Sequence, residues 1–191
     1  MILRKNDCDM PRSKLVRASI VRMWRCRTAG QTVLPGRRTL LWRGVKRSTL
    51  ATVLRRGVQI HKGCLYGSGV YFSTHVCKAL QHARAHRCGN WGSHCRQPRL
   101  CVCKHRACPV ALLVCEVVLG RPYRPKGNPM PVGLGRYTTE LAGATRAPQG
   151  YSSVSATGAS DPFHSEFVVY DPARVLLKYV VEVQMEAVGL H

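Results

Sequence analysis

The chain has 191 residues, of which 30 are Lys or Arg and nine are Asp or Glu, for a formal net charge of +21. This length is sufficient for one domain with a hydrophobic core and too short for two domains of ordinary size, so we expect one domain. The start holds no apolar stretch of signal-peptide length, and the best apolar run, VALLVC, is far shorter than a membrane span. Composition therefore argues against a secreted or membrane-bound chain, and we expect a soluble, intracellular protein of the nucleus or cytoplasm.

The positive charge is concentrated in the first 115 residues. No acid lies between Asp9 and Glu116, whereas residues 116–191 hold seven basic and seven acidic residues. Such a field attracts polyanions and phosphate-bearing small molecules within about one Debye length, roughly 8 Å at physiological salt. Nucleic acid and dinucleotides both fit as partners, and a solvated basic surface is the simpler alternative.

Residues 1–38 are basic, contain the turn signals TAGQ and LPGRR, and are expected to be poorly ordered. Their one weak helical candidate is KLVRASIVRMW, residues 14–24. After them, TLLWRG predicts a short buried strand that ends at Gly44. STLATVLRR then predicts a helix, with Ser48 as its N-cap and Gly57 as its end.

The stretch GSGVYF is a glycine-rich approach to a second short strand. Ser73 or Thr74 is then predicted to cap a second helix through HVCKALQHARAH. Three later stretches are predicted strands by length and β-branched content: VALLVCEVVLG, EFVVYD and RVLLKYVVEVQ. Residues 120–162 are rich in Pro, Gly, Ser and Thr and are predicted to be a long surface excursion. Two early helices followed by several strands indicate an α+β domain.

One acid stands at the entrance of an apolar strand. In HSEFVVYD, alternate residues point to opposite faces, and apolar residues on both faces indicate a central strand. Glu166 at its start either lies at a solvated rim or holds something polar, because burying an unpaired charge is costly. From these residues alone, a position at the solvated rim is the favoured interpretation of Glu166.

Residues 89–108 are rich in Gly, Cys, His and Arg and lack apolar periodicity. With ten cysteines in an intracellular chain, reduced thiols or metal ligands are expected rather than disulfides. Zinc favours four soft ligands and would give such a loop order, although the spacing here contains no CxxC pair. A structural zinc and free thiols in a mobile loop both stay open, and Cys77 and Cys115 are expected in the core. The candidate ligands are Cys95, Cys101, Cys103, His105 and Cys108.

Six segments together resemble the catalytic domain of the poly(ADP-ribose) polymerases, in the same order and over about residues 39–184. They are TLLWRG, STLATVLRRGVQI, YGSGVYFSTHVCKALQHA, LLVCEVVLG, GYSSV and SEFVVYDPARVLLKYVVEV. The resemblance implies an ADP-ribosyltransferase fold, in which two small, mostly antiparallel sheets with flanking helices form an NAD cleft. The domain is then expected to span residues 39–186, with residues 89–108 as an insertion loop. The tankyrase branch of the family carries a zinc site in a Cys/His loop at this place.

The family's signature is a His, a Tyr and a Glu on three strands. The Tyr corresponds to Tyr71 and the Glu to Glu166, whereas the His position holds Arg43. The resemblance implies that Glu166 stabilises the charge on the ribose as the bond to nicotinamide breaks. It also implies that Arg43 takes over the ribose clamp of the imidazole, as an arginine does in toxin-type ADP-ribosyltransferases. The alternatives are a core aromatic for Tyr71 and a solvated surface arginine for Arg43.

Further positions that the resemblance assigns to NAD binding depart from the family. Gly44 keeps the backbone that binds the nicotinamide amide, but the serine that grips this amide falls on Ala79. The second stacking tyrosine falls on His82, and the arginine on the adenosine side falls on Gln59. Tyr71 and His82 are expected to sandwich the nicotinamide ring, and loss of the serine donor is expected to weaken binding by about 1 to 3 kcal/mol.

Three functions follow as hypotheses. The first is an NAD-dependent ADP-ribosyltransferase that acts on a protein or nucleic-acid acceptor and adds one or several units. The second is a catalytically weakened protein that binds NAD, ADP-ribose or a partner. The third is a basic nucleic-acid-binding module that uses residues 1–60 and the cysteine loop. Retention of Glu166 favours the first, because a carboxylate in an apolar strand is a poor choice for stability alone.

Overall fold

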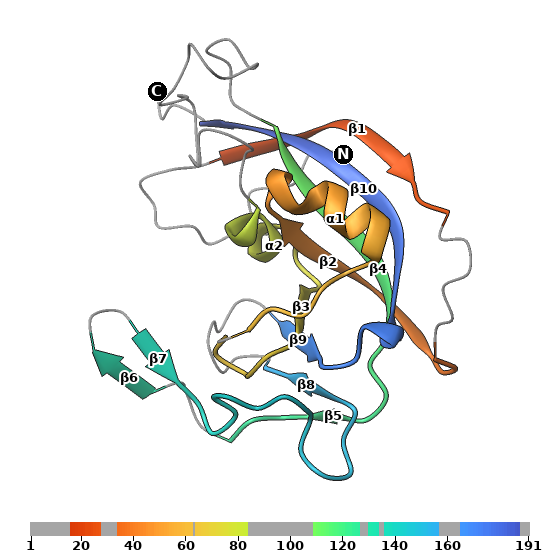
Figure 1. Cartoon of the computed structure of the whole chain (residues 1–191). Helices are drawn as coiled ribbons and strands as arrows, with labels where there is room; N and C mark the ends of the chain where they lie inside the picture. The colour runs from red at the N-terminus through yellow and green to blue at the C-terminus, as the bar shows by residue number, and fades with distance from the viewer. Residues whose placement is uncertain are drawn as a thin grey trace.

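The computed structural model describes residues 16–27, 34–62, 64–83, 109–126, 130–133, 136–156 and 165–187. Eight strands form one sheet in the order β1-β10-β4-β2-β3-β9-β8-β5 (Figure 1). Their bounds are β1 Val16–Arg25, β2 Arg38–Val45, β3 Val70–Ser73, β4 Val110–Val118, β5 Pro122–Tyr123, β8 Ser153–Ser155, β9 Glu166–Val169 and β10 Val175–Ala187. Two further strands, β6 Met130–Gly133 and β7 Arg136–Thr138, form a separate hairpin, and the helices are α1 Arg47–Arg56, α2 Val76–His82 and the 3-10 turn η2 Pro172–Arg174.

The sheet has two halves, a first half β1-β10-β4-β2 and a second half β3-β9-β8-β5, which meet at a narrow joint between β2 and β3. β2 pairs with β4 from Arg38 to Val45, but with β3 only through Trp42 and Ser73. We expected two small sheets that form the cleft, and this detail is not confirmed, because eight of the described strands form one continuous sheet and only β6 and β7 lie apart from it. The expected antiparallel pairing holds for every described pair except β5 with β8, which is parallel.

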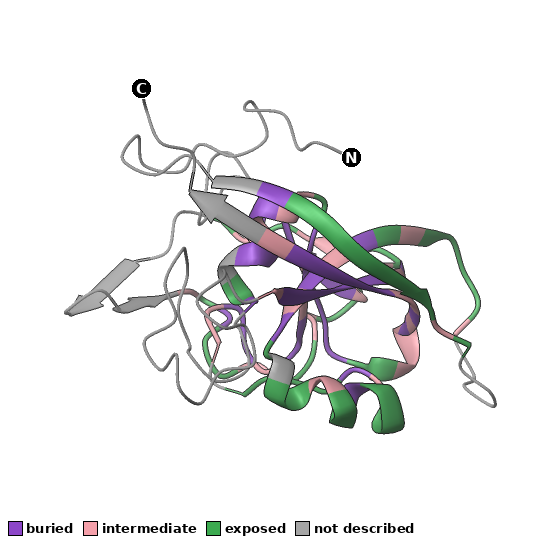
Figure 2. Ribbon diagram, turned by 90° about the horizontal axis from the view of Figure 1, so that it is seen from above, coloured by how far each residue is buried: buried purple, intermediate pink, exposed green. Residues whose placement is uncertain are grey.

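The two helices cover opposite faces of the first half. Leu113 of β4 packs in one apolar cluster with Val53 of α1, and its neighbour Leu112 packs in another with Leu80 of α2. Because successive side chains of a strand point to opposite faces, β4 is buried on both sides. Each fully buried Leu or Val stabilises the fold by about 1.5 to 3 kcal/mol. Residues along β1 and on the outer side of α1 are largely exposed (Figure 2).

Most predicted elements are confirmed, with small shifts at their ends. The strands predicted at 39–44, 110–120, 166–171 and 174–184 correspond to β2, β4, β9 and β10. Helix α1 begins at Arg47 after Lys46, so Ser48 is not its N-cap, whereas Gly57 ends it with φ +77°. Helix α2 has His75 as its N-cap, so neither Ser73 nor Thr74 caps it, although the His75 backbone N–H donates to the Ser73 hydroxyl at 3.1 Å. Residues 84–86 of the predicted second helix lie outside the described residues.

The helix predicted at residues 14–24 is wrong, because residues 16–25 form the edge strand β1. This strand pairs with β10 along its length, so the sheet extends N-terminal to residue 39. A register shift between Ile20 and Arg22 interrupts the alternation of apolar residues. The resulting spacing fits the period of a helix, which explains the error.

The described part of the predicted surface excursion, residues 120–162, contains four short strands, β5 to β8. Cys77 and Cys115 are buried, as expected.

Among the described helices, none has the length and apolar character needed to cross a membrane.

Candidate active site

A pocket of about 640 Å³ lies at the joint between the two halves of the sheet, and both joint residues, Trp42 and Ser73, line it. Its walls come from the end of β2, the first turns of α1, residues 59–61, 64 and 65, β3, α2 and the start of β9. The structure therefore brings together every residue that the sequence nominated for catalysis or NAD binding. These are Arg43, Gly44, Gln59, Tyr71, Ala79, His82 and Glu166.

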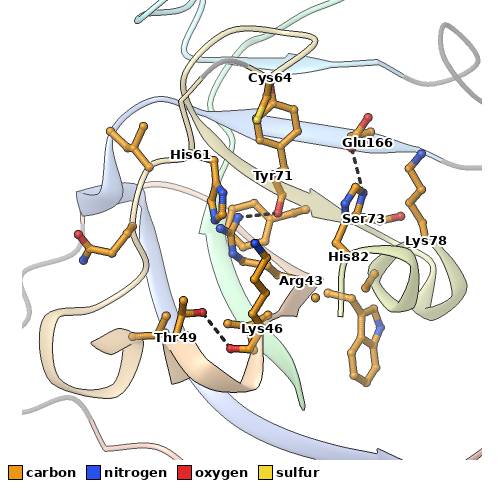
Figure 3. A pocket seen from close by; sticks show the side chains of 18 of the residues that line it. Arg43, Lys46, Thr49, His61, Cys64, Tyr71, Ser73, Lys78, His82 and Glu166 are labelled. Carbon is orange, nitrogen blue, oxygen red and sulfur yellow. Dashed lines mark hydrogen bonds and ion pairs between the residues drawn. The ribbon is translucent and has the colours of Figure 1, made fainter. Parts of the chain in front are cut away.

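Glu166 is the first residue of β9 and is only 7% exposed. It lies opposite Ser73 in the register of β3 and β9, and the Ser73 hydroxyl donates to the Ser165 carbonyl at 2.7 Å, which fixes the start of the strand. Its Oε1 lies 4.0 Å from Nε2 of His82, whose side chain is 58% exposed (Figure 3). The carboxylate is thus a buried group at the pocket wall and not a solvated rim residue.

Tyr71 is held by its hydroxyl, which donates to the Gly67 carbonyl at 2.7 Å and accepts from the Tyr66 N–H at 3.0 Å. Burial raises the pKa of this phenol, so it stays neutral at physiological pH. Because the hydroxyl is used to fix the turn 64–67, what Tyr71 offers the pocket is chiefly its ring. This arrangement suits stacking against a flat ligand.

Arg43 on β2 is only 7% exposed, so it is not a solvated surface arginine. Its Nη1 donates to the Tyr71 carbonyl at 3.0 Å, and its guanidinium carbon lies 5.9 Å from the centre of the Phe72 ring. The buried Nε has no hydrogen-bond partner. Burial lowers the pKa of Arg43 to about 10, so the side chain is still a cation at neutral pH.

Gly44 is required by the close packing of α2 on β2. A Cβ at this position would lie 2.0 Å from the Ala79 carbonyl oxygen and 2.6 Å from the Ala83 nitrogen, and neither backbone atom can move away cheaply. β3 pairs with β2 only at Trp42. On the edge of β2 that faces β3, residues 43–45 therefore have no strand partner among the described strands, whereas the other edge pairs with β4. Backbone groups on such an edge can bind a ligand amide.

Gln59 contributes less to the pocket than expected. Its Nε2 donates to the carbonyls of Arg56 and Gly57, both at 3.0 Å, and so satisfies the C-terminal end of α1. Ala79 lies on α2, is 3% exposed and offers no side-chain donor.

Three basic residues that no sequence motif indicated also line the pocket: Lys46, His61 and Lys78. Burial lowers the pKa of His61, and the charges of Arg43 and Lys46 lower it further, so this imidazole is neutral at physiological pH. No spacing pattern marks them, since Lys46 follows a strand and His61 lies in an irregular loop. Only the folded chain brings them to one place.

The five candidate zinc ligands, Cys95, Cys101, Cys103, His105 and Cys108, lie outside the described residues. Within the described ranges, no group of three or more His, Cys, Asp or Glu side chains could hold a metal ion. Each described cysteine is a free thiol.

The family model of the poly(ADP-ribose) polymerase catalytic domain matches residues 7–185. This chain belongs to that family. The resemblance seen in the six motifs is therefore confirmed, and with it the ADP-ribosyltransferase fold in general terms. The match begins before the domain boundary that we expected at residue 39, and it includes β1. The Arg-Tyr-Glu variant of the signature remains a prediction.

Several poly(ADP-ribose) polymerases are similar to the chain. Poly [ADP-ribose] polymerase 1 of Gallus gallus is 31% identical over 172 residues, covering 77% of this chain and 15% of that protein. Poly [ADP-ribose] polymerase 1 of Caenorhabditis elegans is 28% identical, with 78% and 17% covered. Poly [ADP-ribose] polymerase 2 of Homo sapiens is 26% identical, with 80% and 27% covered. The chain thus spans only a small part of these relatives' length.

Proposed function

We propose that this chain is an NAD-dependent ADP-ribosyltransferase that moves ADP-ribose to a protein or nucleic-acid acceptor, with Glu166 as its catalytic carboxylate. One observation carries the proposal: Glu166, 7% exposed, lines the same pocket as Tyr71 and Gly44. A buried carboxylate costs stability, so its position at a pocket wall supports a functional role. Family membership supports the same reaction.

The proposed reaction replaces one bond at C1′ of the nicotinamide ribose with another. The bond from C1′ to the nicotinamide nitrogen breaks, and its electron pair leaves with nicotinamide while positive charge develops on the ribose ring. The Glu166 carboxylate stabilises this charge and accepts a hydrogen bond from the ribose 2′-hydroxyl. The acceptor's nucleophilic atom then bonds to C1′, and its proton passes to Glu166 or to water.

Four further residues have proposed roles in holding NAD. The ring of Tyr71 stacks on the nicotinamide, with the imidazole of His82 on the other side. The backbone of Gly44 binds the nicotinamide amide from the open edge of β2. Arg43 donates to a ribose hydroxyl in place of an imidazole.

The test is transfer from labelled NAD to a mixture of acceptors, with the Glu166→Gln variant for comparison. We expect the wild-type chain to label an acceptor and Glu166→Gln to lose at least about a hundredfold in rate, the usual scale for loss of an electrostatic catalytic group. Glu140→Gln is the matched control, because Glu140 is exposed, binds Tyr123 at 2.7 Å and lies outside the pocket lining. Wild type without labelling or NAD hydrolysis, or Glu166→Gln as active as wild type, would contradict the proposal. Gel electrophoresis of the labelled acceptor distinguishes transfer of one ADP-ribose unit, which gives a single band, from transfer of several units, which gives a ladder.

A weakened, NAD-binding protein is the second candidate. Two observations favour it: Ala79 offers no donor, and the Gln59 amide nitrogen is used by α1. The deciding variant is Arg43→His, which restores the imidazole of the family signature. This candidate predicts a gain in transfer rate, whereas an unchanged or lower rate means that Arg43 is the residue that this site uses.

A further inference from the structure

His82 and Glu166 meet at the wall of the pocket (Figure 3). Nε2 of His82 lies 4.0 Å from Oε1 of Glu166. His82 is the last residue of α2 and Glu166 is the first residue of β9, so regular structure positions both backbones. The side chain of His82 is 58% exposed, against 10% for that of Glu166. The imidazole is thus the member of the pair that an incoming group reaches more easily from solvent.

The imidazole lies among charges of both signs. Lys78 is one helical turn before His82 on α2 and lines the same pocket, as does Arg43 of β2. These cations oppose a second positive charge, whereas Glu166 stabilises an imidazolium. A neutral ring that can gain a proton beside a carboxylate has the properties of a general base. The other titratable side chains that line the pocket, among the described residues, are Lys46, His61, Cys64 and Tyr71.

Glu166 by itself is poorly suited to take a proton from an acceptor. A carboxyl group ordinarily has a pKa of about 4, so it holds a proton at neutral pH far less readily than an imidazole does. In the proposed reaction Glu166 also faces the positive charge on the ribose and the 2′-hydroxyl. A hydroxyl acceptor needs a base, because its oxygen is a weak nucleophile while it carries its proton.

We propose that His82 is the general base that accepts the proton of a hydroxyl acceptor. This inference rests on the proposed function, because it names the group that receives the acceptor's proton in that reaction. The bond from C1′ to the nicotinamide nitrogen breaks, its electron pair leaves with nicotinamide, and the acceptor oxygen bonds to C1′. The proton of this oxygen goes to Nε2 of His82, the ring nitrogen that faces Glu166. The imidazolium pairs with the carboxylate and later releases the proton to water.

This role is separable from stacking on nicotinamide. Stacking uses the face of the imidazole, whereas its two nitrogens lie at the edge. A tyrosine offers a larger ring for stacking, but its phenol ordinarily titrates at about pH 10 and is a poor base at neutral pH. His82→Tyr therefore separates the binding of NAD from activation of the acceptor.

The test measures transfer from labelled NAD to two synthetic peptides that differ only in one acceptor side chain, Ser or Glu. The carboxylate of the Glu peptide carries no proton at neutral pH and needs no base. We expect His82→Tyr to lower kcat on the Ser peptide about a hundredfold, the usual scale for a general base, and on the Glu peptide about threefold at most. The KM for NAD should stay unchanged or fall.

The pH profile and chemical rescue give two further readouts. The wild-type rate on the Ser peptide should rise from about pH 5 to 8, where an imidazole ordinarily titrates, and His82→Tyr should lose this rise. Imidazole added to the His82→Ala chain should restore part of the rate. His75→Tyr is the matched control, because His75 stands at the opposite end of α2 and outside the pocket lining, and it should keep the rate and the rise.

A His82→Tyr chain with the wild-type rate on the Ser peptide overturns the inference. An equal loss on both peptides, or a His82→Ala chain that imidazole does not accelerate, does so as well. A pH rise that disappears in His61→Gln instead would place the base at His61 and also overturn it. Transfer that excludes the Ser peptide overturns this inference alone. A wild-type chain without transfer or NAD hydrolysis overturns it together with the proposed function.

Discussion

Burial of Arg43 costs the fold free energy. The pKa of its guanidinium falls from an ordinary 12.5 to about 10, because burial disfavours the charged form. Below pH 10 both the folded and the unfolded chain are protonated, so the cost is fully present at neutral pH. As pH rises from about 10 to 12.5, the folded chain releases the proton first, and the free energy of unfolding rises. The cost at pH 7 is on the order of 3 kcal/mol.

Arg43→Met is therefore expected to raise the free energy of unfolding at pH 7 by about 1 to 2 kcal/mol. Removal of the buried charge contributes more than the loss of the hydrogen bond to the Tyr71 carbonyl, which is worth about 1 kcal/mol. Urea unfolding followed by circular dichroism measures the change, with Arg55→Met on the exposed side of α1 as control. A loss of more than 1 kcal/mol would mean that Arg43 stabilises the fold.

Single residues of the site differ in how far the sequence identifies them. Glu166 and Tyr71 stand in motifs whose order and spacing are specific, so the sequence could nominate them. Arginines are mostly exposed, and nothing in TLLWRG predicts that Arg43 is buried. Lys46 follows Arg43 by three residues, whereas His61 lies near Arg43 only because α1 turns the chain back, which is a tertiary contact without a local signal.

At the scale of elements, strands that are buried on both faces were the easiest to predict. β4 and β10 are long β-branched runs, and their composition decides their structure whatever lies beside them. β1 is different, because Ser19–Arg25 are all exposed and only pairing with β10 makes this segment a strand. Pairing between residues more than 150 positions apart leaves no periodic trace in the sequence.

The packing of α2 on β2 predicts a strict requirement for glycine at position 44. Gly44→Ala would push its Cβ into the Ala79 carbonyl and force the helix away from the strand. We expect a loss of about 2 to 3 kcal/mol in unfolding free energy, on the scale of overpacked cores, together with weaker NAD binding. Thermal unfolding and calorimetry measure the two effects. Wild-type stability for this variant would show that α2 shifts without cost.

Glu116 links three neighbouring strands, because its carboxylate contacts Arg38 of β2 at 3.1 Å and Lys178 of β10 at 3.2 Å. Desolvation acts to raise the pKa of Glu116, but the hydrogen bonds and charges of Lys178 and Arg38 outweigh it, so the pKa lies below its ordinary value. A lowered pKa means that this stabilisation is present above the ordinary pKa and is lost as pH falls through the lowered one.

Glu116→Gln is thus expected to lower the free energy of unfolding by about 0.5 to 1 kcal/mol at pH 7, after allowance for solvent screening. The difference from wild type should disappear in acid, below the lowered pKa, because the native carboxylate is then protonated as well. Unfolding curves at neutral and acid pH measure it. Arg38→Gln and Lys178→Gln complete double-mutant cycles, and zero coupling in both would exclude this network as a source of stability.

For the molecule as a whole, the joint between the two half-sheets decides where the site is. Arg43 and Gly44 come from one half, and Tyr71 and Glu166 come from the other. The order of the motifs along the chain predicts both sets of residues but not the single pair, Trp42 and Ser73, that connects the halves. A ligand in the pocket would contact both halves and therefore reinforce this joint.

Ligand binding is accordingly expected to protect both halves in hydrogen exchange. With ADP-ribose at about 100 times its dissociation constant, the folded chain gains roughly 2.7 kcal/mol, because the ligand binds only the native state. We expect slower amide exchange at residues 43–46, 70–73 and 166–169 together, while the exposed edge strand β1 and the remote strand β5 change little. Mass spectrometry of the Glu166→Gln chain with and without ADP-ribose measures this pattern. Protection confined to one half would mean that the ligand does not span the joint, and the shared pocket would then be the wrong basis for the chemistry.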